Sequence, residues 1–472
     1  MNLTVREIAA LPDFHPKNID SVIDKKLRGI STDSRSVLPG QLFIALRGEK
    51  FDGHDFIAGA LESGALCAVV DRKWKSSAKQ PLIVVEDTTK ALGMIARFYR
   101  RKYSIPVIAV VGSNGKTTTK EMITAVLRKR FRILSTKGNL NNQIGVPLTI
   151  LQLKPAHQLA VVEIGTNHPG EQKYLCDILA PTHGALTNIG HEHLEFFGDL
   201  NGVAKEEGEL FKVLGKSGTA FVNIDDARVV AQAKPVRKRV TYGFLDSRAA
   251  VRGKLLKVDD DGCFKFAVTE KGKKPFAVHL SVPGKHIMAN ALAAATVGLS
   301  FRVPAREIRQ ALEKFSGFKK RMEVFTAGGV KILNDTYNAN SDSVVPALET
   351  LQVMKVRGKK IVVLADMREL GSSSIEEHRR IGRTVGNMGF EYLLTCGSDA
   401  KYICEEAGVE HKFFCDSREQ LSETLCGIVA AGDAVLVKGS RGMKMENVVV
   451  TLRNYLKSLR KSKLQSLASS LN

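Results

Sequence analysis

The sequence predicts an α/β fold of three domains: a small N-terminal α/β domain, a central domain of the P-loop ATPase type with a mainly parallel sheet and helices, and a C-terminal Rossmann-like α/β domain. Three observations predict it. The chain has 472 residues, about three times the length of an ordinary domain. Short apolar runs rich in β-branched residues alternate with stretches of helical period. A glycine turn near residue 112 separates one such run from a helix. We expect the domains at 1–86, 87–315 and 316–472.

The N-terminal part contains three strand-like runs and a helical stretch, FIAGALESG. The runs cover residues 41–46, 65–71 and 81–87. Two loops, at 31–35 and 47–56, concentrate polar groups. Turn formation and anion binding explain such loops equally well, so local chemistry leaves both open.

The central part is organised around the stretch from residue 105 to residue 127. An apolar strand at 105–111 is followed by a glycine turn and a helix, and Lys116 and Thr117 lie where the helix begins. This order aims backbone N–H groups and a positive helix end at an anion, while the Thr117 hydroxyl is available to Mg²⁺. The match is the short form GxxGKT, because Val110 replaces an earlier glycine. A plain strand-to-helix turn is the alternative, but the strand and helix on either side favour nucleotide binding.

Two further strand ends carry polar side chains. Glu163 lies at the end of the apolar run 159–165, where a carboxylate suits Mg²⁺ because this ion prefers oxygen ligands. His191 and His193 follow the run 184–190. A zinc site would need a third soft ligand nearby, and loop histidines are often only polar, so the residues alone leave their role open.

The alternation of strands and helices restarts after residue 329. The strand-like runs are 330–335, 359–366, 391–396, 411–416 and 433–440. A polar loop follows the first of them, and its Asp335, Tyr337 and Asn338 could hold a ribose or a base, or could simply form turns. Before this part, an alanine-rich helix carries Asn290 on its outer side.

Composition limits the possible partners and location. The net charge of +21 suits nucleic acid or small polyanionic substrates. The basic runs are scattered and form no nucleic-acid-binding motif, so we expect no nucleic-acid partner. No apolar run reaches the roughly 18 residues of a membrane span, and the first residues lack the apolar core of a signal peptide. We therefore expect a cytoplasmic protein, and a monomer, whose seven widely spaced cysteines are reduced thiols.

Eight motifs in order identify a known family. They are GSNGKTT at 112, GNLNNQIGVP at 138, EIGTNHPGE at 163, HLE at 193, PGKH at 283 with Asn290, NDTYNAN at 334, DMRELG at 366 and VKGSRG at 437. Together they closely resemble the Mur ligases of peptidoglycan synthesis over nearly the whole chain. GNLNN and NDTYNAN favour the dipeptide-adding branch, and the DNPR signature of the sister ligase that adds the third amino acid is absent. Folylpolyglutamate-type ligases and basic P-loop ATPases that bind nucleic acid are the alternatives.

The resemblance implies ATP-driven amide synthesis with Mg²⁺, in which UDP-N-acetylmuramoyl-tripeptide is first phosphorylated on its carboxylate and then joined to D-alanyl-D-alanine. It implies that the third domain closes over the second. The implied catalytic residues are Lys116, Glu163, His193 and Glu207, and the implied metal ligands are Thr117, Glu163, His193 and Glu207. The implied ATP-binding residues are Gly112, Ser113, Asn114, Gly115, Lys116, Thr117, Thr118, Asn290, Arg321, Asp335, Tyr337 and Asn338. The implied substrate-binding residues are Ser31, Asp33, Ser34, Arg35, Asn139, Asn141, Asn142, Asn167, His168, Ser440 and Arg441, the last two from position alone.

The sequence departs from the family pattern at three positions. Many members serve the second metal with a lysine carboxylated on its amine, and that position is Glu207 here. Lys205 cannot replace it, because side chains two residues apart on a helix point in nearly opposite directions. Our hypothesis is that Glu207 supplies a permanent carboxylate instead. Ile287 and Ser341 replace a usual asparagine and a usual proline.

Overall fold

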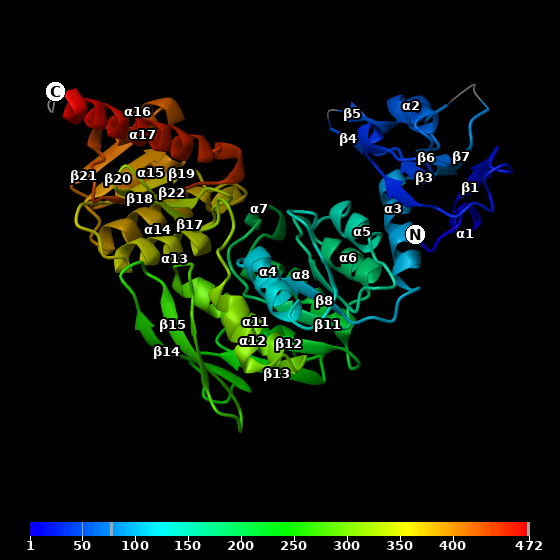
Figure 1. The fold of residues 1–472 in the computed structure, drawn as a ribbon, viewed down its shortest axis with the longest axis horizontal. Helices are drawn as coiled ribbons and strands as arrows, with labels where there is room; N and C mark the ends of the chain where they lie inside the picture. Colours follow the sequence, from blue (N-terminus) through cyan, green and yellow to red (C-terminus); the bar gives the residue numbers. More distant parts are fainter. Residues whose placement is uncertain (50, 76–78, 470–472) are drawn as a thin grey trace.

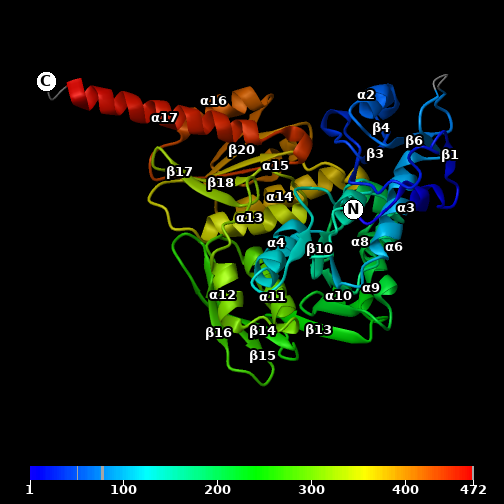
Figure 2. The same ribbon diagram turned by 45° about the vertical axis from the view of Figure 1, so that its right-hand side comes forward.

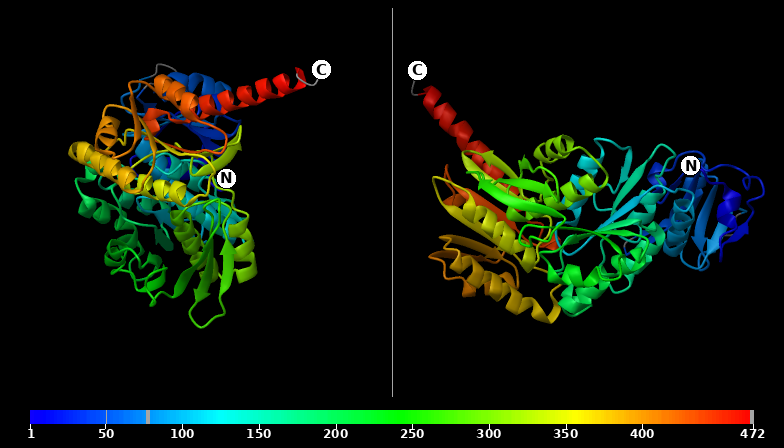
Figure 3. Two further views of the ribbon diagram at one scale, coloured as in Figure 1. Left: turned by 90° about the vertical axis from the view of Figure 1, so that its left-hand side faces the viewer. Right: turned by 90° about the horizontal axis from the view of Figure 1, so that it is seen from below.

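A computed structural model of the chain describes residues 1–49, 51–75 and 79–469 (Figure 1). Its strands form three large sheets of five, nine and six strands and one two-stranded ribbon. The three large sheets lie in three lobes that follow the order of the chain, and the turned views show the same arrangement (Figures 2 and 3). The α/β fold class is therefore confirmed, whereas the domain boundaries at residues 86 and 315 stay predictions.

The N-terminal sheet has the strand order β1-β7-β6-β3-β2 and is parallel except for the β1–β7 pair. The strands are β1 (His15–Lys17), β2 (Gly29–Ser31), β3 (Gln41–Ile44), β6 (Cys67–Asp71) and β7 (Leu82–Val85). Side chains that alternate along β3 and β6 are buried on opposite faces, with Phe43 and Val70 beside α2 (Ile57–Glu62). Burial on both faces explains why these strands are almost continuously apolar.

Helix α3 (Thr88–Arg100) joins the N-terminal lobe to the central lobe. The Asp87 side chain caps its first turn by accepting hydrogen bonds from two backbone N–H groups. Its apolar side packs against α5 (Gly145–Ile150) and α6 (Glu171–Leu179). The buried Tyr99 hydroxyl donates a 2.7 Å hydrogen bond to the Leu153 carbonyl, so α3 is anchored in the central lobe.

The central sheet has the order β16-β15-β14-β13-β12-β11-β8-β10-β9 and is parallel from β14 to β9. Its parallel strands are β8 (Val107–Val111), β9 (Ile133–Ser135), β10 (Leu159–Glu163), β11 (His183–Leu186), β12 (Thr219–Asn223), β13 (Lys238–Gly243) and β14 (Val251–Val258). From β8 the chain first builds β9 and β10 on one side and then β11 and β12 on the other. The strand order therefore reverses at β8, and parallel α/β sheets bind ligands at such a point.

Antiparallel strands β15 (Phe264–Glu270) and β16 (Phe276–His279) complete this sheet. Helix α11 (Lys285–Ser300) then returns across the lobe, packs against α4 (Lys116–Leu127), and is followed by α12 (Ala305–Glu313). The small side chains of its many alanines allow this close approach. At Gly298 the two helices are so near each other that an added Cβ would lie 2.5 Å from a Val126 methyl group.

The C-terminal sheet has the order β17-β18-β22-β19-β20-β21 and is parallel except for the β17–β18 pair. The strands are β17 (Glu323–Ala327), β18 (Val330–Asp335), β19 (Lys360–Ala365), β20 (Tyr392–Cys396), β21 (His411–Cys415) and β22 (Ala434–Lys438). The helices are α13 (Ser341–Val353), α14 (Ser374–Asn387), α15 (Ala400–Glu406), α16 (Arg418–Ile428) and α17 (Glu446–Ser469). Helix α17 extends away from the lobe to the C-terminal end of the chain (Figures 1 and 2).

Two further features concern the helices and the cysteines. Among the helices of the described residues, none combines the length and the apolar character that a membrane crossing requires. All seven cysteines are free, and six of them are buried.

Candidate active site

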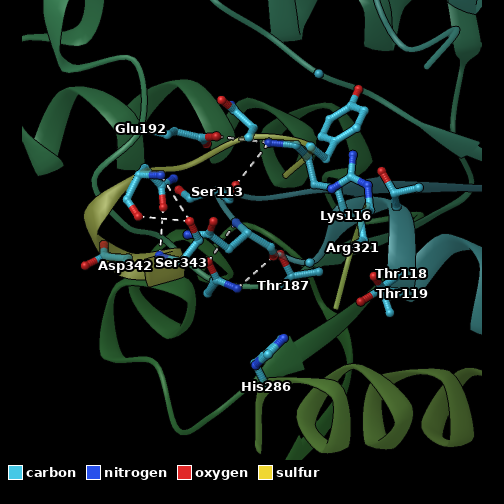
Figure 4. Close-up of a pocket in the computed structure, with 18 of the residues that line it drawn as sticks. Ser113, Lys116, Thr118, Thr119, Thr187, Glu192, His286, Arg321, Asp342 and Ser343 are labelled. Atoms are coloured by element: carbon cyan, nitrogen blue, oxygen red, sulfur yellow. Dashed lines mark hydrogen bonds and ion pairs between the residues drawn. The ribbon is translucent and has the colours of Figure 1, made fainter. Parts of the chain in front are cut away.

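A cavity of about 580 Å³ lies at the carboxyl ends of β8, β10 and β11, between the central lobe and the C-terminal lobe. The central lobe contributes the glycine turn after β8 and the segments that follow β10 and β11. The C-terminal lobe contributes residues around 337–346 and 368–370. Figure 4 shows side chains from both lobes directed at the same space. The cavity therefore occupies the point where the strand order reverses.

The glycine turn has a backbone that only glycine adopts without strain. Gly115 has a φ of 81°, and a Cβ added there would lie 2.6 Å from Asn290 Oδ1. Gly112 has a φ of 117°, and a Cβ there would lie 2.3 Å from Thr187 Oγ1. The short GxxGKT form thus has its two glycines where the chain turns and where neighbouring groups come closest.

The protein itself binds three backbone N–H groups of this turn. The Gly112 N–H donates to Glu207 Oε2 at 2.8 Å, and the Ser113 N–H donates to the Asn188 carbonyl at 3.0 Å. The Asn114 N–H donates to Asn188 Oδ1, also at 3.0 Å. The N–H groups in the first turn of α4 have no partner within the helix, so they form the cradle that remains for an anion.

Lys116 stands at the start of α4 and faces Glu192 (Figure 4). Its Nζ lies 3.0 Å from Glu192 Oε2 and 3.4 Å from the Ser113 carbonyl. Burial opposes the charge of this amine, but nearby carboxylates, Glu192 first, outweigh burial and hold its pKa above the usual value. Lys116 is therefore a cation held beside the cradle.

Glu163 presents one satisfied and one unsatisfied oxygen at the end of β10. Its Oε1 accepts hydrogen bonds from Thr117 Oγ1 at 3.1 Å and from Asn141 Nδ2 at 2.8 Å. Its Oε2 is buried without a hydrogen-bond partner. A buried carboxylate oxygen with no donor suits a hard cation such as Mg²⁺. Within residues 1–49, 51–75 and 79–469, no three His, Cys, Asp or Glu side chains form a ready-made metal site, so a cation at Glu163 would need further ligands, among them nucleotide oxygens and water.

The two histidines that follow β11 contact the C-terminal lobe. His193 Nδ1 lies 2.6 Å from Glu369 Oε2, and this close contact with His193 lowers the pKa of the Glu369 carboxyl. The backbone N–H and Nδ1 of His191 lie 2.7 Å and 2.9 Å from Asp342 Oδ2. Both histidines line the cavity, and the contacts join its two walls.

Glu207, at the end of α8 (Leu200–Glu207), lies behind the glycine turn and does not line the cavity. Its side chain is buried and accepts the Gly112 hydrogen bond. Burial, followed by the charge of Glu192, raises the pKa of the Glu207 carboxyl well above its usual range. As a direct metal ligand Glu207 stays a prediction, and its observed contact is with the loop.

The other predicted ATP-binding residues line the cavity, apart from Gly112. The Arg321 guanidinium stacks on the Tyr337 ring at 3.7 Å from the ring centre. Asp335 accepts a 3.0 Å hydrogen bond from the Met322 N–H and a 2.6 Å hydrogen bond from Lys438 Nζ. Ile287, the departure from the family pattern, also lines this part of the cavity.

Some of the predicted substrate residues line the cavity and others do not. Asn141, Asn142, Asn167 and His168 line the cavity, whereas Asn139 is exposed outside it. Ser440 is buried, and its Oγ is bound to the Arg368 N–H and to the Ala339 carbonyl, while the side chain of Arg441 is 61% exposed; neither lines the cavity.

The loop of Ser31, Asp33, Ser34 and Arg35 belongs to the N-terminal lobe and does not line the cavity. Asp33 caps a single 3₁₀ turn and pairs with Arg35 at 2.8 Å. The Arg35 hydrogen bonds lower the pKa of Asp33 to about 2. This loop would therefore meet a ligand at a point separate from the cavity.

Sequence reasoning missed several residues of the cavity wall: Glu192, Asn188, His286, Arg368, Glu369 and Lys438. Most of them lie inside motifs that had been recognised, such as DMRELG and VKGSRG. Glu192 lies between His191 and His193, where the polar pattern could have indicated it.

Comparisons with known proteins agree over most of the chain. Sequence models of the Mur ligase family match residues 26–100 (catalytic domain), 110–298 (middle domain) and 320–441 (glutamate ligase domain). The UDP-N-acetylmuramoyl-tripeptide--D-alanyl-D-alanine ligase of Escherichia coli is 35% identical over 435 residues, which cover 91% of this chain and 94% of that protein. The ligase of the same name from Haemophilus influenzae is 33% identical over 441 residues, covering 91% and 94%.

Solved structures of Mur ligases also resemble this chain. A crystal structure of MurF from Acinetobacter baumannii superposes with a TM-score of 0.84 at 30% identity, covering 94% of this chain and all of that chain. MurF ligase from Thermotoga maritima, solved with ADP, gives a TM-score of 0.81 at 28% identity, covering 91% and 98%.

Proposed function

The chain belongs to the Mur ligase family, and we infer that it is the ATP-dependent ligase that adds D-alanyl-D-alanine to UDP-N-acetylmuramoyl-tripeptide in peptidoglycan precursor synthesis. The observation that carries this function is the meeting of three groups in one cavity. These are the cradle of α4 with Lys116, the strand-end carboxylate of Glu163, and the wall of the C-terminal lobe.

The reaction has two steps. First, an oxygen of the tripeptide carboxylate attacks the γ-phosphorus of ATP, the bond to the bridging oxygen breaks, and ADP leaves with that electron pair. Second, the amine of D-alanyl-D-alanine attacks the carbonyl carbon of the acyl phosphate, the C–O bond breaks, and inorganic phosphate leaves while the amine loses its proton. Lys116 and the N–H groups of α4 face the place where negative charge spreads over the transferred phosphoryl group.

We propose that Thr117 and Glu163 would hold one Mg²⁺ on the wall of the cavity, and that a second Mg²⁺ would lie near His193. The donor set supports this, because the unsatisfied Glu163 Oε2 lies next to the Thr117 hydroxyl. Mg²⁺ would screen the like charges of the carboxylate and the γ-phosphate. His193 now contacts Glu369, and that contact would have to open for His193 to take part.

The N-terminal lobe would take the UDP end of the nucleotide peptide, near Ser31 to Arg35, and Asn141, Asn167 and His168 would face its muramoyl peptide. Support comes from the position of these three residues on the cavity wall, and Asn141 donates a hydrogen bond to the Glu163 carboxylate. The monomeric state, the cytoplasmic location and the lack of a nucleic-acid partner stay predictions of the sequence.

The decisive assay measures whether ADP release depends on which substrates are present. We expect ADP to be released only when UDP-N-acetylmuramoyl-tripeptide and D-alanyl-D-alanine are both present, with the joined pentapeptide as the product. ADP release stimulated by DNA or RNA, together with salt-sensitive polynucleotide binding, would favour the P-loop ATPase alternative. Turnover with a folate and glutamate would favour the folylpolyglutamate type.

A further inference from the structure

Four cationic side chains of lysine and arginine line the cavity, and three of them already have a partner. Lys116 faces Glu192 at 3.0 Å, and Lys438 faces Asp335 at 2.6 Å. Arg321 stacks on the Tyr337 ring. The fourth, Arg368, has no carboxylate within 4.0 Å anywhere in the part of the chain that the structure describes. Its guanidinium is exposed, and its one hydrogen-bonding contact is Nη2 to Met443 Sδ at 3.6 Å.

The structure holds the Arg368 backbone firmly while its side chain stays free. The Arg368 N–H donates a 2.8 Å hydrogen bond to the buried Ser440 Oγ, which in turn donates to the Ala339 carbonyl. A Cβ added to Gly442 would lie 2.5 Å from Arg368 Nη1, so the glycine leaves room for the guanidinium. The DMRELG and VKGSRG motifs therefore meet at this side chain.

Glu369, the residue after Arg368, contacts His193 of the central lobe. Glu369 also lines the cavity, and its carboxylate lies 2.6 Å from His193 Nδ1. Arg368 and Glu369 thus offer a cation and an anion on adjacent residues of one wall. An extended dipeptide spans at most about 7 Å, and D-alanyl-D-alanine carries an ammonium at one end and a carboxylate at the other.

We propose that Arg368 binds the C-terminal carboxylate of the D-alanyl-D-alanine acceptor, an assignment that rests on the proposed function. The amine end of the dipeptide must reach the acyl phosphate near Lys116, which turns its carboxylate end toward the remaining wall. A guanidinium is suited to that end, because it donates two parallel hydrogen bonds to one carboxylate. Ser440 then acts as a positioning residue for Arg368, since its side chain is buried and touches the Arg368 backbone.

The test pairs a variant of the protein with a variant of the substrate. D-alanyl-D-alanine and its C-terminal amide are compared with the wild type, Arg368→Met, which keeps the aliphatic stem, and Arg368→Lys, which keeps only the charge. Arg383→Met is the matched control, because Arg383 lies on α14 and pairs with Glu376 and Glu406 away from the cavity. The KM for ATP and the KM for UDP-N-acetylmuramoyl-tripeptide are measured for every variant and also report a folded site.

The wild type and Arg383→Met are expected to prefer the acid over the amide by about tenfold to hundredfold in kcat/KM. Arg368→Met should lose most of that preference by losing activity on the acid alone, Arg368→Lys should be intermediate, and the two other KM values should stay unchanged. An undiminished preference in Arg368→Met would overturn the assignment, as would a rise in the KM for ATP or for the nucleotide peptide instead. A wild type that joins neither acceptor would overturn the proposed function itself, and the assignment with it.

Discussion

The Glu207 carboxylate lies 2.8 Å from the Gly112 nitrogen and does not line the cavity. Glu207→Gln keeps an oxygen that can accept this hydrogen bond, so we expect kcat to change by no more than about threefold and the Mg²⁺ concentration for half-maximal rate to stay the same. Glu207→Ala leaves the Gly112 N–H unpaired, which costs about 1–3 kcal/mol, and should raise the KM for ATP. Steady-state kinetics in bicarbonate-free buffer measures both variants.

A direct metal ligand at residue 207 would give a different pattern. Glu207→Gln would then need much more Mg²⁺ for the same rate, because a neutral amide is a weaker ligand than a carboxylate. A strong requirement of the wild type for added bicarbonate would contradict both roles, since Glu207 has no amine to carboxylate.

His286 lies on the cavity wall and makes the free energy of unfolding depend on pH. Burial is the main cause that lowers its pKa to about 4; the charge of Asp335 opposes this shift and the charge of Lys438 adds to it. Between the ordinary value of 6.5 and about 4, the unfolded chain binds a proton that the folded protein does not, so stability falls as the pH drops through this window. We expect His286→Asn to reduce this acid-induced loss of unfolding free energy by at most about 3 kcal/mol. Urea unfolding at pH 7 and pH 4.5 measures the free energy of unfolding of the wild type and of His286→Asn. Equal losses of this free energy in both proteins would contradict the prediction.

Residue identities were easier to predict than side-chain directions. The sequence indicated Lys116, Thr117 and Glu163 because a strand end and a helix start fix their positions. It could not show that Glu207 faces the loop, because the direction of a side chain depends on how α8 is rotated about its axis. The sequence analysis considered His191 and His193 as possible metal ligands and did not consider Glu192, which lies between them.

The glycine turn is the element on which nucleotide binding depends. Gly115→Ala adds a Cβ 2.6 Å from Asn290 Oδ1 in a left-handed backbone, so we expect the Kd for ATP to rise at least tenfold. Gly272→Ala is the control, because Gly272 has a similar φ of 79° but nothing within 4 Å of the added Cβ. Calorimetric titration with ATP measures both proteins, and equal affinities would show that the contact with Asn290 does not matter.

Elements were predicted well where burial makes the pattern simple. The parallel strands β8, β10 and β19 are buried on both faces and read as short apolar runs. Strand β15 and the first four residues of β14, which pair antiparallel, alternate between buried and more exposed side chains, so the sequence indicated only a β-rich region there. Strand order is set by contacts between distant segments, which one sequence does not reveal.

At the scale of the whole molecule, two histidine contacts help to join the cavity walls. His191 and His193 bind Asp342 and Glu369 across the boundary between the lobes. Asp342→Ala removes the acceptor of two His191 hydrogen bonds, so we expect a looser C-terminal lobe and a KM for ATP raised about threefold to tenfold. Small-angle scattering should show a larger radius of gyration, and an unchanged radius with an unchanged KM would contradict this.

Chain length and the alternation of strands and helices predicted the three-lobed architecture. They did not predict which distant segments lie side by side. The cavity unites segments near residues 115, 163, 192 and 337, which lie far apart in the sequence. Only the family motifs indicated that these segments serve one reaction, and the N-terminal loop at residues 31–35 is separate from the cavity that they form.

The central claim is that this cavity joins a carboxylate to ATP before the amine attacks, and the fate of one oxygen atom tests it most directly. The terminal carboxylate of UDP-N-acetylmuramoyl-tripeptide is labelled with a heavy oxygen isotope and turned over with ATP and D-alanyl-D-alanine. Because the carboxylate oxygen becomes the bridge of the acyl phosphate, mass spectrometry should find one labelled oxygen in each released phosphate. Phosphate without the label, formed alongside the joined product, would contradict the account.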